Sequence, residues 1–259
     1  MNRAARHDHP KCMGSDGVFL TAEWRHLAML NYEVDAGLLL PFVPVGTELD
    51  RWNGRVFVSL VGFRFLKTKL FGFLPIPMRS NFDEVNLRFY VRRLAGGEVR
   101  RGVVFIHEVV PSRAIAFVAR TFYNENYVAL PMAHEIHSVG DNGLRVAYRW
   151  RTGQRWSGIN LETDGNSELP SEGSVKQFIT EHYWGYAAQP DGGCVEYRVT
   201  HPSWRVWHVR QSAFEGDAEE LYGKGLAAAL QGKPESAFLA GGSAVTVMRG
   251  RRLWCAGER

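Results

Sequence analysis

Along most of this chain, apolar residues alternate with polar ones over short runs, and glycine, proline and asparagine separate the runs. Such alternation is typical of β-strands, whose successive side chains point to opposite faces. We predict strands at Arg55–Phe65, Asp83–Arg93, Gly102–Val110, Ala114–Tyr123, Ala129–His137, Leu144–Arg151, Cys194–Thr200, Trp204–Gln211 and Ala244–Arg249.

Helical patterns are few. Asp35–Leu40 predicts a short helix capped by Asp35, and Ser174–Tyr186 and Gly216–Leu230 predict two further helices. The chain has neither a fixed repeat nor a low-complexity linker, so we predict one mainly β domain (α+β minor) over residues 18–253. Residues 1–17 are expected to be a disordered lead and residues 254–259 a short tail.

Composition narrows the class of protein. The 259 residues are 45% hydrophobic, enough for a core of normal size, but no run approaches the ~18 apolar residues of a membrane-spanning helix. The N-terminus lacks the apolar segment of a signal peptide. Cys12, Cys194 and Cys255 lie far apart and outside any C-x-x-C spacing, which favours free thiols in the cytoplasm over disulfides or zinc.

Charge and motifs predict neither nucleic acid nor cofactor as partners. The net charge is +4, but the arginines are spread along the chain instead of forming a continuous basic stripe. A DNA-associated protein would need one basic face with aromatic platforms. His134 and His137 lack the helical H-E-x-x-H spacing of a zinc site, so we expect no metal. The sequence leaves a homo-oligomer open.

Two linked segments carry the candidate chemistry. On a strand at residues 83–91, Glu84, Asn86 and Arg88 share one face with Tyr90. Such a face either contacts solvent or lines a polar cavity.

The second segment strengthens the cavity interpretation. Hydrogen-bonding side chains follow one another directly after an apolar run, at Arg120, Tyr123, Asn124, Glu125, Asn126 and Tyr127. Asparagine-rich loops often serve only as turns. Two phenols beside two amides and a guanidinium are less usual in a loop, so we predict a small-molecule pocket here.

These two segments resemble the active site of the acetoacetate decarboxylases. In that family a buried glutamate precedes a segment of the form GRE-x-x-x-x-PKK, which supplies the Schiff-base lysine. The resemblance places the glutamate at Glu84 and the arginine at Arg120, but the lysine segment falls on Asn126, Tyr127 and Val128. Arg25 matches a family arginine near the N-terminus, whereas Ser59 replaces a second acid.

The chain resembles still more closely a YqjF-like bacterial family of unknown function in the same superfamily. The motifs that carry this resemblance are W-R-x-L, P-x-G-T-E-L-D, V-S-L-V-G-F-x-F, E-V-N-L-R-x-Y-V, R-G-V-x-F, A-R-x-x-Y-N-E-N-Y, KQFITEHYWGY and H-P-x-W, spread over about residues 20 to 250. The resemblance implies a single-domain antiparallel β-barrel or cone of the decarboxylase-like type with a few peripheral helices.

Imine chemistry requires an amine nucleophile, which the matching segment lacks. We therefore predict a cytoplasmic protein whose polar pocket binds a small oxo or carboxylate compound, and not a Schiff-base decarboxylase. Glu84 and Tyr127 are the catalytic candidates. The ligand-binding candidates are Arg25, Asn86, Arg88, Arg120, Tyr123, Asn124 and Asn126. Two alternatives stay open: a non-catalytic binding or interaction module, and a purely structural bridge from Arg120 to Glu84 or Glu125.

Overall fold

The protein is described by a computed structural model that covers residues 17–76 and 80–254, without the side chains of Ala119, Phe122 and Tyr123. The predicted lead up to residue 16 and the tail from residue 255, with Cys12 and Cys255, lie outside the described residues. Cys194 is buried as a free thiol. None of the helices in the described ranges has the length and apolar character needed to cross a membrane.

Strands dominate the chain, as predicted. They are β1 (Val18–Val34), β2 (Glu48–Leu49), β3 (Val56–Leu70), β4 (Leu74–Pro75), β5 (Phe82–Ala95), β6 (Glu98–Val110), β7 (Tyr127–Ala129), β8 (Met132–Val139), β9 (Gly143–Thr152), β10 (Arg155–Glu168), β11 (Trp184–Ala188), β12 (Cys194–Thr200), β13 (Val206–Glu215), β14 (Ser236–Met248) and β15 (Arg251–Leu253). The helices are α1 (Arg113–Tyr123), α2 (Val175–Thr180) and α3 (Glu219–Leu230), with 3-10 turns η1 (Ala36–Leu38) and η2 (Leu40–Phe42).

The sheet closes on itself. Its hydrogen-bonded order runs β12-β11-β6-β5-β3-β1-β14, and β14 pairs again with β12 through Val199–Val247 and Thr200–Thr246. The ring is antiparallel except where β11 runs parallel to β6, and the short β7 also runs parallel to β6. Within the described residues, every strand of the ring thus has a neighbouring strand on both sides.

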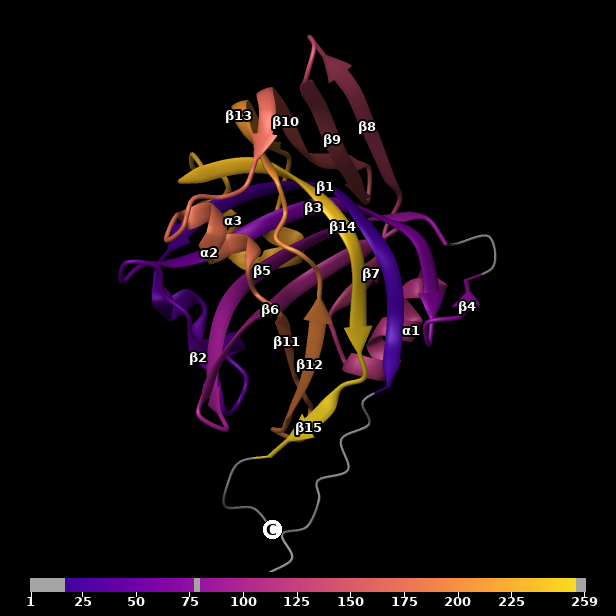
Figure 1. Ribbon diagram of the computed structural model, residues 1–259, viewed down its shortest axis with the longest axis vertical. Coiled ribbons are helices and arrows are strands. Elements are labelled where there is room, and N and C mark those ends of the chain that lie inside the picture. The colour runs from indigo at the N-terminus through magenta and orange to yellow at the C-terminus, as the bar shows by residue number, and fades with distance from the viewer. Residues whose placement is uncertain (1–16, 77–79, 255–259) are drawn as a thin grey trace, which may run out of the picture.

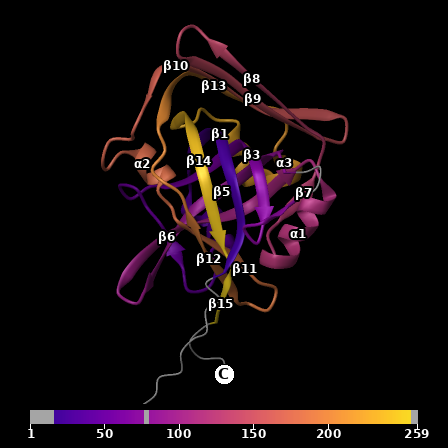
Figure 2. The ribbon, with the colours of Figure 1, turned by 45° about the vertical axis from the view of Figure 1, so that its right-hand side comes forward.

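Strands β13, β10, β9 and β8 continue the sheet from β14 and fold over one side of the ring (Figures 1 and 2). In both views this second layer lies at the top, while α1 lies on the lower right. The outer face of the ring is therefore covered: one apolar core joins Val58, Leu60 and Leu87 of the ring to Tyr148 and Trp150 of β9.

Because the outer face of the ring is covered, the alternation of side chains along β5 determines where its polar face points. Val85, Leu87 and Phe89 belong to the outer core that the second layer and α3 cover. Their neighbours Glu84 and Asn86 must then face the interior of the ring, because side chains alternate along a strand. The polar stripe predicted from residues 83–91 is thus enclosed by protein, with Glu84 2% and Asn86 1% exposed.

One predicted strand is wrong: Ala114–Tyr123 belongs to helix α1. Its β-branched and aromatic residues favoured a strand. The buried and half-buried positions nevertheless recur at helical spacing, with Ser112 and Ala116 buried and Ile115 and Val118 half-buried. Helix α1 ends at Asn124, which adopts a left-handed conformation with φ of 56° and whose backbone N–H bonds to the carbonyl of Arg120 at 3.0 Å.

The predicted helix Ser174–Tyr186 is only half correct. Ser174, at the start of the predicted range, caps α2 by accepting a hydrogen bond from the backbone N–H of Gln177. The helix stops after Thr180, and Trp184–Ala188 forms β11 of the ring. The helix predicted at Gly216–Leu230 is confirmed as α3, and Asp35 caps η1, so a 3-10 turn replaces the predicted α-helix there.

The antiparallel pairing of β11 with β12 allows a test of packing. Gly185 faces Tyr197 across the strand pair, and a Cβ at Gly185 would approach the Tyr197 ring to 2.1 Å. Gly185→Ala should therefore displace this ring and lower the free energy of unfolding by about 1–3 kcal/mol, measured by urea denaturation. Gly17→Ala is the control, because its Cβ would meet only the flexible Arg249 side chain. Equal stability of the two variants would contradict this packing.

Candidate functional site

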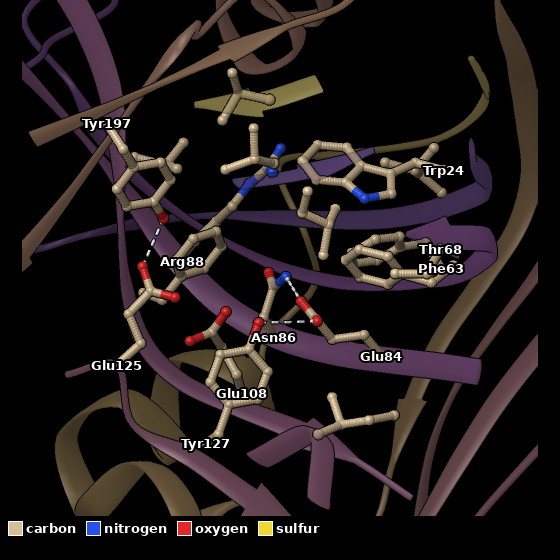
Figure 3. A pocket seen from close by; sticks show the side chains of 18 of the residues that line it. Trp24, Phe63, Thr68, Glu84, Asn86, Arg88, Glu108, Glu125, Tyr127 and Tyr197 are labelled. Atoms are coloured by element: carbon tan, nitrogen blue, oxygen red, sulfur yellow. Dashed lines mark hydrogen bonds between the residues drawn. The ribbon is translucent and has the colours of Figure 1, made fainter. Parts of the chain in front are cut away.

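A cavity of about 190 Å³ lies inside the ring. The labelled side chains of β5, β6 and β7 point into it, together with Tyr197 from β12 (Figure 3). Its polar lining residues are Thr68, Glu84, Asn86, Arg88, Glu108, Glu125, Tyr127, Thr180, His182, Tyr197 and His201. The rest of the wall is mostly aromatic and aliphatic.

Strand register brings the first two glutamates together. Glu84, Asn86 and Arg88 are successive inward positions of β5. Asn86 pairs directly with Glu108 of β6, so the Glu108 side chain stands next to that of Asn86 on the same face. The register shifts between Leu87 and Arg88, which is the mark of a β-bulge.

Asn126 fixes the third glutamate. Its carbonyl accepts a hydrogen bond from the Glu108 backbone N–H at 3.0 Å, and its side-chain amide donates to the Ile106 carbonyl at 3.2 Å. Both bonds tie the segment after α1 to β6. The residues on either side of Asn126, Glu125 and Tyr127, are thereby held beside Glu108, and Tyr127 pairs with Glu108 in the parallel β6–β7 ladder.

We call Glu84, Glu108 and Glu125 the carboxyl cluster. The Asn86 amide donates to one oxygen of Glu84 at 3.0 Å, and the Tyr127 hydroxyl donates to the other at 3.1 Å. The Tyr197 hydroxyl donates to Glu125 at 2.5 Å. The partners of these carboxyl groups are thus two phenols and an amide. Among the described residues, no arginine or lysine forms an ion pair with Glu84, Glu108 or Glu125.

Burial makes the cluster retain protons. Desolvation raises the pKa of Glu84 to about 7 against the hydrogen bonds from Asn86 and Tyr127, which lower it. Desolvation likewise raises the pKa of Glu125 to about 7. The pKa of Glu108 lies well above its ordinary value because of burial and then the charges of Glu125 and Glu84. At neutral pH the three groups therefore share protons and can both donate and accept them.

Arg88 is the cation of the cavity. It is 8% exposed, and its guanidinium lies 5.9 Å from the centre of the Tyr90 ring. Its Nε atom is buried without a hydrogen-bond partner, and no described carboxylate forms an ion pair with it. A buried guanidinium without an anion is costly. Arg88 therefore presents unused donors to whatever enters the cavity.

His182 and Asp50 form a second buried pair at the wall. His182 Nε2 lies 3.2 Å from a carboxylate oxygen of Asp50, which also accepts a hydrogen bond from Arg101 at 2.7 Å. Desolvation lowers the pKa of His182 to about 4, so this imidazole is neutral at pH 7. Since the ionised Asp50 can only accept, Nε2 carries the proton and Nδ1 is left as an acceptor without a partner.

Two predicted arginines do not reach the cavity. Arg25 lies near the middle of β1, where its guanidinium pairs with Glu23 at 2.8 Å and the side chain is 38% exposed. Arg120 lies on the exposed side of α1 and bonds to the carbonyl of Tyr127, with its Nε at 2.7 Å. The prediction that both arginines bind the ligand in the pocket is therefore wrong, as is the alternative bridge from Arg120 to a glutamate. Arg120 positions the backbone of Tyr127 instead.

The three predicted residues between Arg120 and Tyr127 also lie away from the cavity or outside the described part of the chain. Asn124 is exposed and its amide donates to the Ala188 carbonyl at 3.1 Å. Asn126 has the clamping role given above. The side chain of Tyr123 lies outside the described residues. Ser59, which stands in place of the family's second acid, instead bonds to Asn31 and Tyr90, both at 2.6 Å.

Sequence reasoning missed Glu108, Tyr197 and His182 as wall residues. Glu108 did leave a signal, because it is a lone carboxylate inside the apolar run VVFIHEVV. Nothing in the sequence placed Tyr197 or His182 near Glu84, since each arrives from a distant segment through ring closure.

The fold and the cavity define a mainly β protein whose ring-closed sheet encloses a pocket. A model of the DUF2071 family, described as an uncharacterized conserved protein, matches residues 21–244, and the chain belongs to that family. The uncharacterized protein YqjF of Bacillus subtilis is 30% identical over 122 residues, which are 46% of this chain and 48% of YqjF. The match thus spans about half of that relative.

Solved structures confirm the fold. Acetoacetate decarboxylase from Legionella pneumophila superposes with a TM-score of 0.63 at 13% identity, over 96% of this chain and 93% of that one. The enduracididine biosynthesis enzyme MppR, complexed with pyruvate, gives 0.63 at 14% identity, over 95% and 93%. An acetoacetate decarboxylase-like enzyme from Sphingomonas wittichii gives 0.60 at 12%, over 96% and 98%. At these identities the likeness concerns the fold alone.

The raised carboxyl pKa values predict a pH-dependent stability. The folded protein holds protons on the cluster up to about pH 7, whereas the unfolded chain releases them near pH 4.5, so this stabilising contribution is lost as pH rises. Glu108→Gln removes a carboxyl group that burial disfavours in its ionised form. Its free energy of unfolding relative to wild type should therefore rise between pH 5 and pH 8, by on the order of 1–3 kcal/mol in chemical denaturation.

Glu98→Gln, at an exposed position of β6, is the control and should show no such change. A difference between Glu108→Gln and wild type that stays constant from pH 5 to pH 8 would contradict the cluster's proton retention.

Proposed function

We propose that this protein binds a small oxo-carboxylate in the cavity, with Arg88 holding the carboxylate. The observation that carries the proposal is the buried Arg88 guanidinium, which has neither an ion-pair partner nor a hydrogen bond on Nε among the described residues. Guanidinium groups bind carboxylates through two parallel hydrogen bonds, and a low-dielectric site strengthens them. A ligand carboxylate would neutralise Arg88.

The carboxyl cluster then suits proton transfer to or from the bound oxo compound. Glu84 has a pKa of about 7 and is bonded to Tyr127, so it can take a proton from a carbon beside the ligand carbonyl. The pKa of Tyr127 lies well above 10 because of burial and the neighbouring carboxylates, so its hydroxyl stays protonated. This hydroxyl donates to Glu84 in the free protein and would turn its one proton to the carbonyl oxygen of the bound ligand. The chemistry proposed is enolisation by a general acid and base.

An imine route receives no support. The described residues that line the cavity include no lysine. Lys67 of β3 points its Nζ at Glu23 at 2.6 Å and is 74% exposed. The ligand class is supported by MppR, whose pyruvate complex shares the fold. A non-catalytic binding module is the second candidate, favoured by this lack of a nucleophilic amine at the cavity wall.

Arg88 variants test the binding step with pyruvate as probe. Arg88→Met should weaken pyruvate binding at least about tenfold in calorimetric titration, because it removes the charge-assisted bonds while keeping the length of the side chain. Arg92→Met is the matched control on the same strand, since Arg92 is exposed and pairs with Glu48 outside the cavity. Equal loss in both variants, or none in Arg88→Met, would remove Arg88 from the site.

Glu84→Gln separates the enzyme from the binding module. If Glu84 is the base, wild type should exchange the methyl protons of pyruvate with deuterated water, and Glu84→Gln should lower that rate at least about 100-fold while pyruvate binding changes less than about fivefold. Proton NMR follows the exchange. Exchange at the wild-type rate in Glu84→Gln would exclude Glu84 as the base; binding without exchange in wild type would favour the module.

Borohydride reduction tests the rejected route. Treatment with pyruvate and sodium borohydride should leave the intact mass unchanged, because no described lysine lines the cavity. A stable pyruvate adduct on any lysine would show that imine chemistry occurs.

A further inference from the structure

The cavity has two chemically different sides. One side is formed by the carboxyl cluster and Arg88. The other is an aromatic wall of residues from β1, β3, β5 and the segment before β13, namely Trp24, Phe63, Phe65, Phe82 and Trp204. Figure 3 shows Trp24 and Phe63 facing the space between them and the polar groups.

The rings of the aromatic wall pack on one another and therefore form a fixed surface. Trp24 makes edge contacts with Phe63 and Phe65, with ring centres 5.5 and 5.7 Å apart, and with Trp204 at 6.2 Å. Phe65 stacks on Phe82 at 4.6 Å. Trp204 is anchored by its indole N–H to Ser243 at 2.9 Å. The surface presented to the cavity is thus apolar and held in place before any ligand binds.

The cavity is larger than a ligand of the size of pyruvate would fill. An apolar cavity of about 150 Å³ accommodates a benzene ring. The cavity here measures about 190 Å³, which is enough for a ring together with a short polar group. A three-carbon oxo acid at Arg88 would leave the aromatic wall without a partner, and apolar surface gains free energy when a ligand covers it.

We propose that the ligand is a 2-oxo acid with an apolar tail, either an aromatic ring or a chain of about four to six carbons, whose tail covers the aromatic wall while its carboxylate meets Arg88. This inference rests on the proposed function, because it takes the carboxylate position from Arg88. It adds the substrate class: a hydrophobic oxo acid instead of a small metabolite such as pyruvate. The buried and unpartnered indole N–H of Trp24 gives this wall one hydrogen-bond donor.

A series of probes measures the contribution of the tail. Pyruvate, 2-oxohexanoate and phenylpyruvate share the oxo acid group and differ in the apolar part. Each added methylene should lower the Kd about fourfold, so 2-oxohexanoate, with three more methylenes, should bind about 60-fold more tightly than pyruvate, and phenylpyruvate at least as tightly. The heat capacity of binding, from titrations at several temperatures, should become more negative along the series.

Variants of the wall locate the tail. Phe82→Leu and Trp24→Leu should each weaken phenylpyruvate binding about tenfold and change pyruvate binding less than about twofold. Phe82→Leu removes a smaller ring than Trp24→Leu and is the milder change if Trp24→Leu fails to fold. Trp156→Leu is the matched control, because Trp156 is 46% exposed and does not line the cavity.

The outcomes separate this inference from the proposed function. Arg88-dependent binding of pyruvate with equal or weaker binding of phenylpyruvate would overturn the apolar tail and leave the proposed function standing. Tighter binding of phenethylamine than of phenylpyruvate would overturn the carboxylate assignment, and with it both proposals. Tight phenylpyruvate binding that needs Arg88 and the wall, but not Trp156, supports both.

Discussion

The site depends on one constraint: the sheet encloses carboxyl groups in its interior because its outer face is covered by the second layer and α3. The apolar face of β5 packs under the second layer, so its polar face has only the ring interior to occupy. Ring closure through β12 and β14 then removes Glu84 and Glu108 from water. Desolvation is in turn the main reason why the pKa values of these glutamates are raised. The fold itself thus raises the pKa values of these glutamates.

The segment after α1 completes this arrangement without a lysine. Asn126 clamps the chain to β6, and Arg120 bonds to the backbone of Tyr127, so that the Tyr127 phenol reaches Glu84. Tyr127, a neutral donor, thus forms a hydrogen bond with Glu84, a carboxyl group of raised pKa. It suits proton transfer to a bound carbonyl compound, which is the function we propose. The unpaired Arg88 supplies the charge that such a compound requires.

Much of the candidate site could be predicted from the sequence, because polar and apolar residues alternate regularly along β5. The inward set Glu84, Asn86 and Arg88 follows from a period of two, and the structure places all three at the cavity. Tyr127 was also predicted and contacts Glu84. The mainly β class and most strands followed from the same pattern.

The failures have physical causes. Ala114–Tyr123 combines strand-forming residues with helical spacing, and the packing of Ala116 decides for the helix. Arg25 and Arg120 were placed by resemblance, which says nothing of where a long side chain points, and each found a nearer acceptor than the cavity. Tyr197 and His182 could not be predicted, because only ring closure brings β12 and the end of α2 to β5. Such contacts depend on register between distant strands.

Nuclear magnetic resonance of the protein labelled with ¹³C at the glutamate carboxyl groups, followed from pH 4 to pH 9, measures the acidity that enclosure imposes. At least one carboxyl resonance should titrate near pH 7 and disappear in Glu84→Gln, as expected for a carboxyl group enclosed by the ring. Titration of every glutamate below about pH 5 would show that water reaches the cluster, and the proposed site would lose its physical basis.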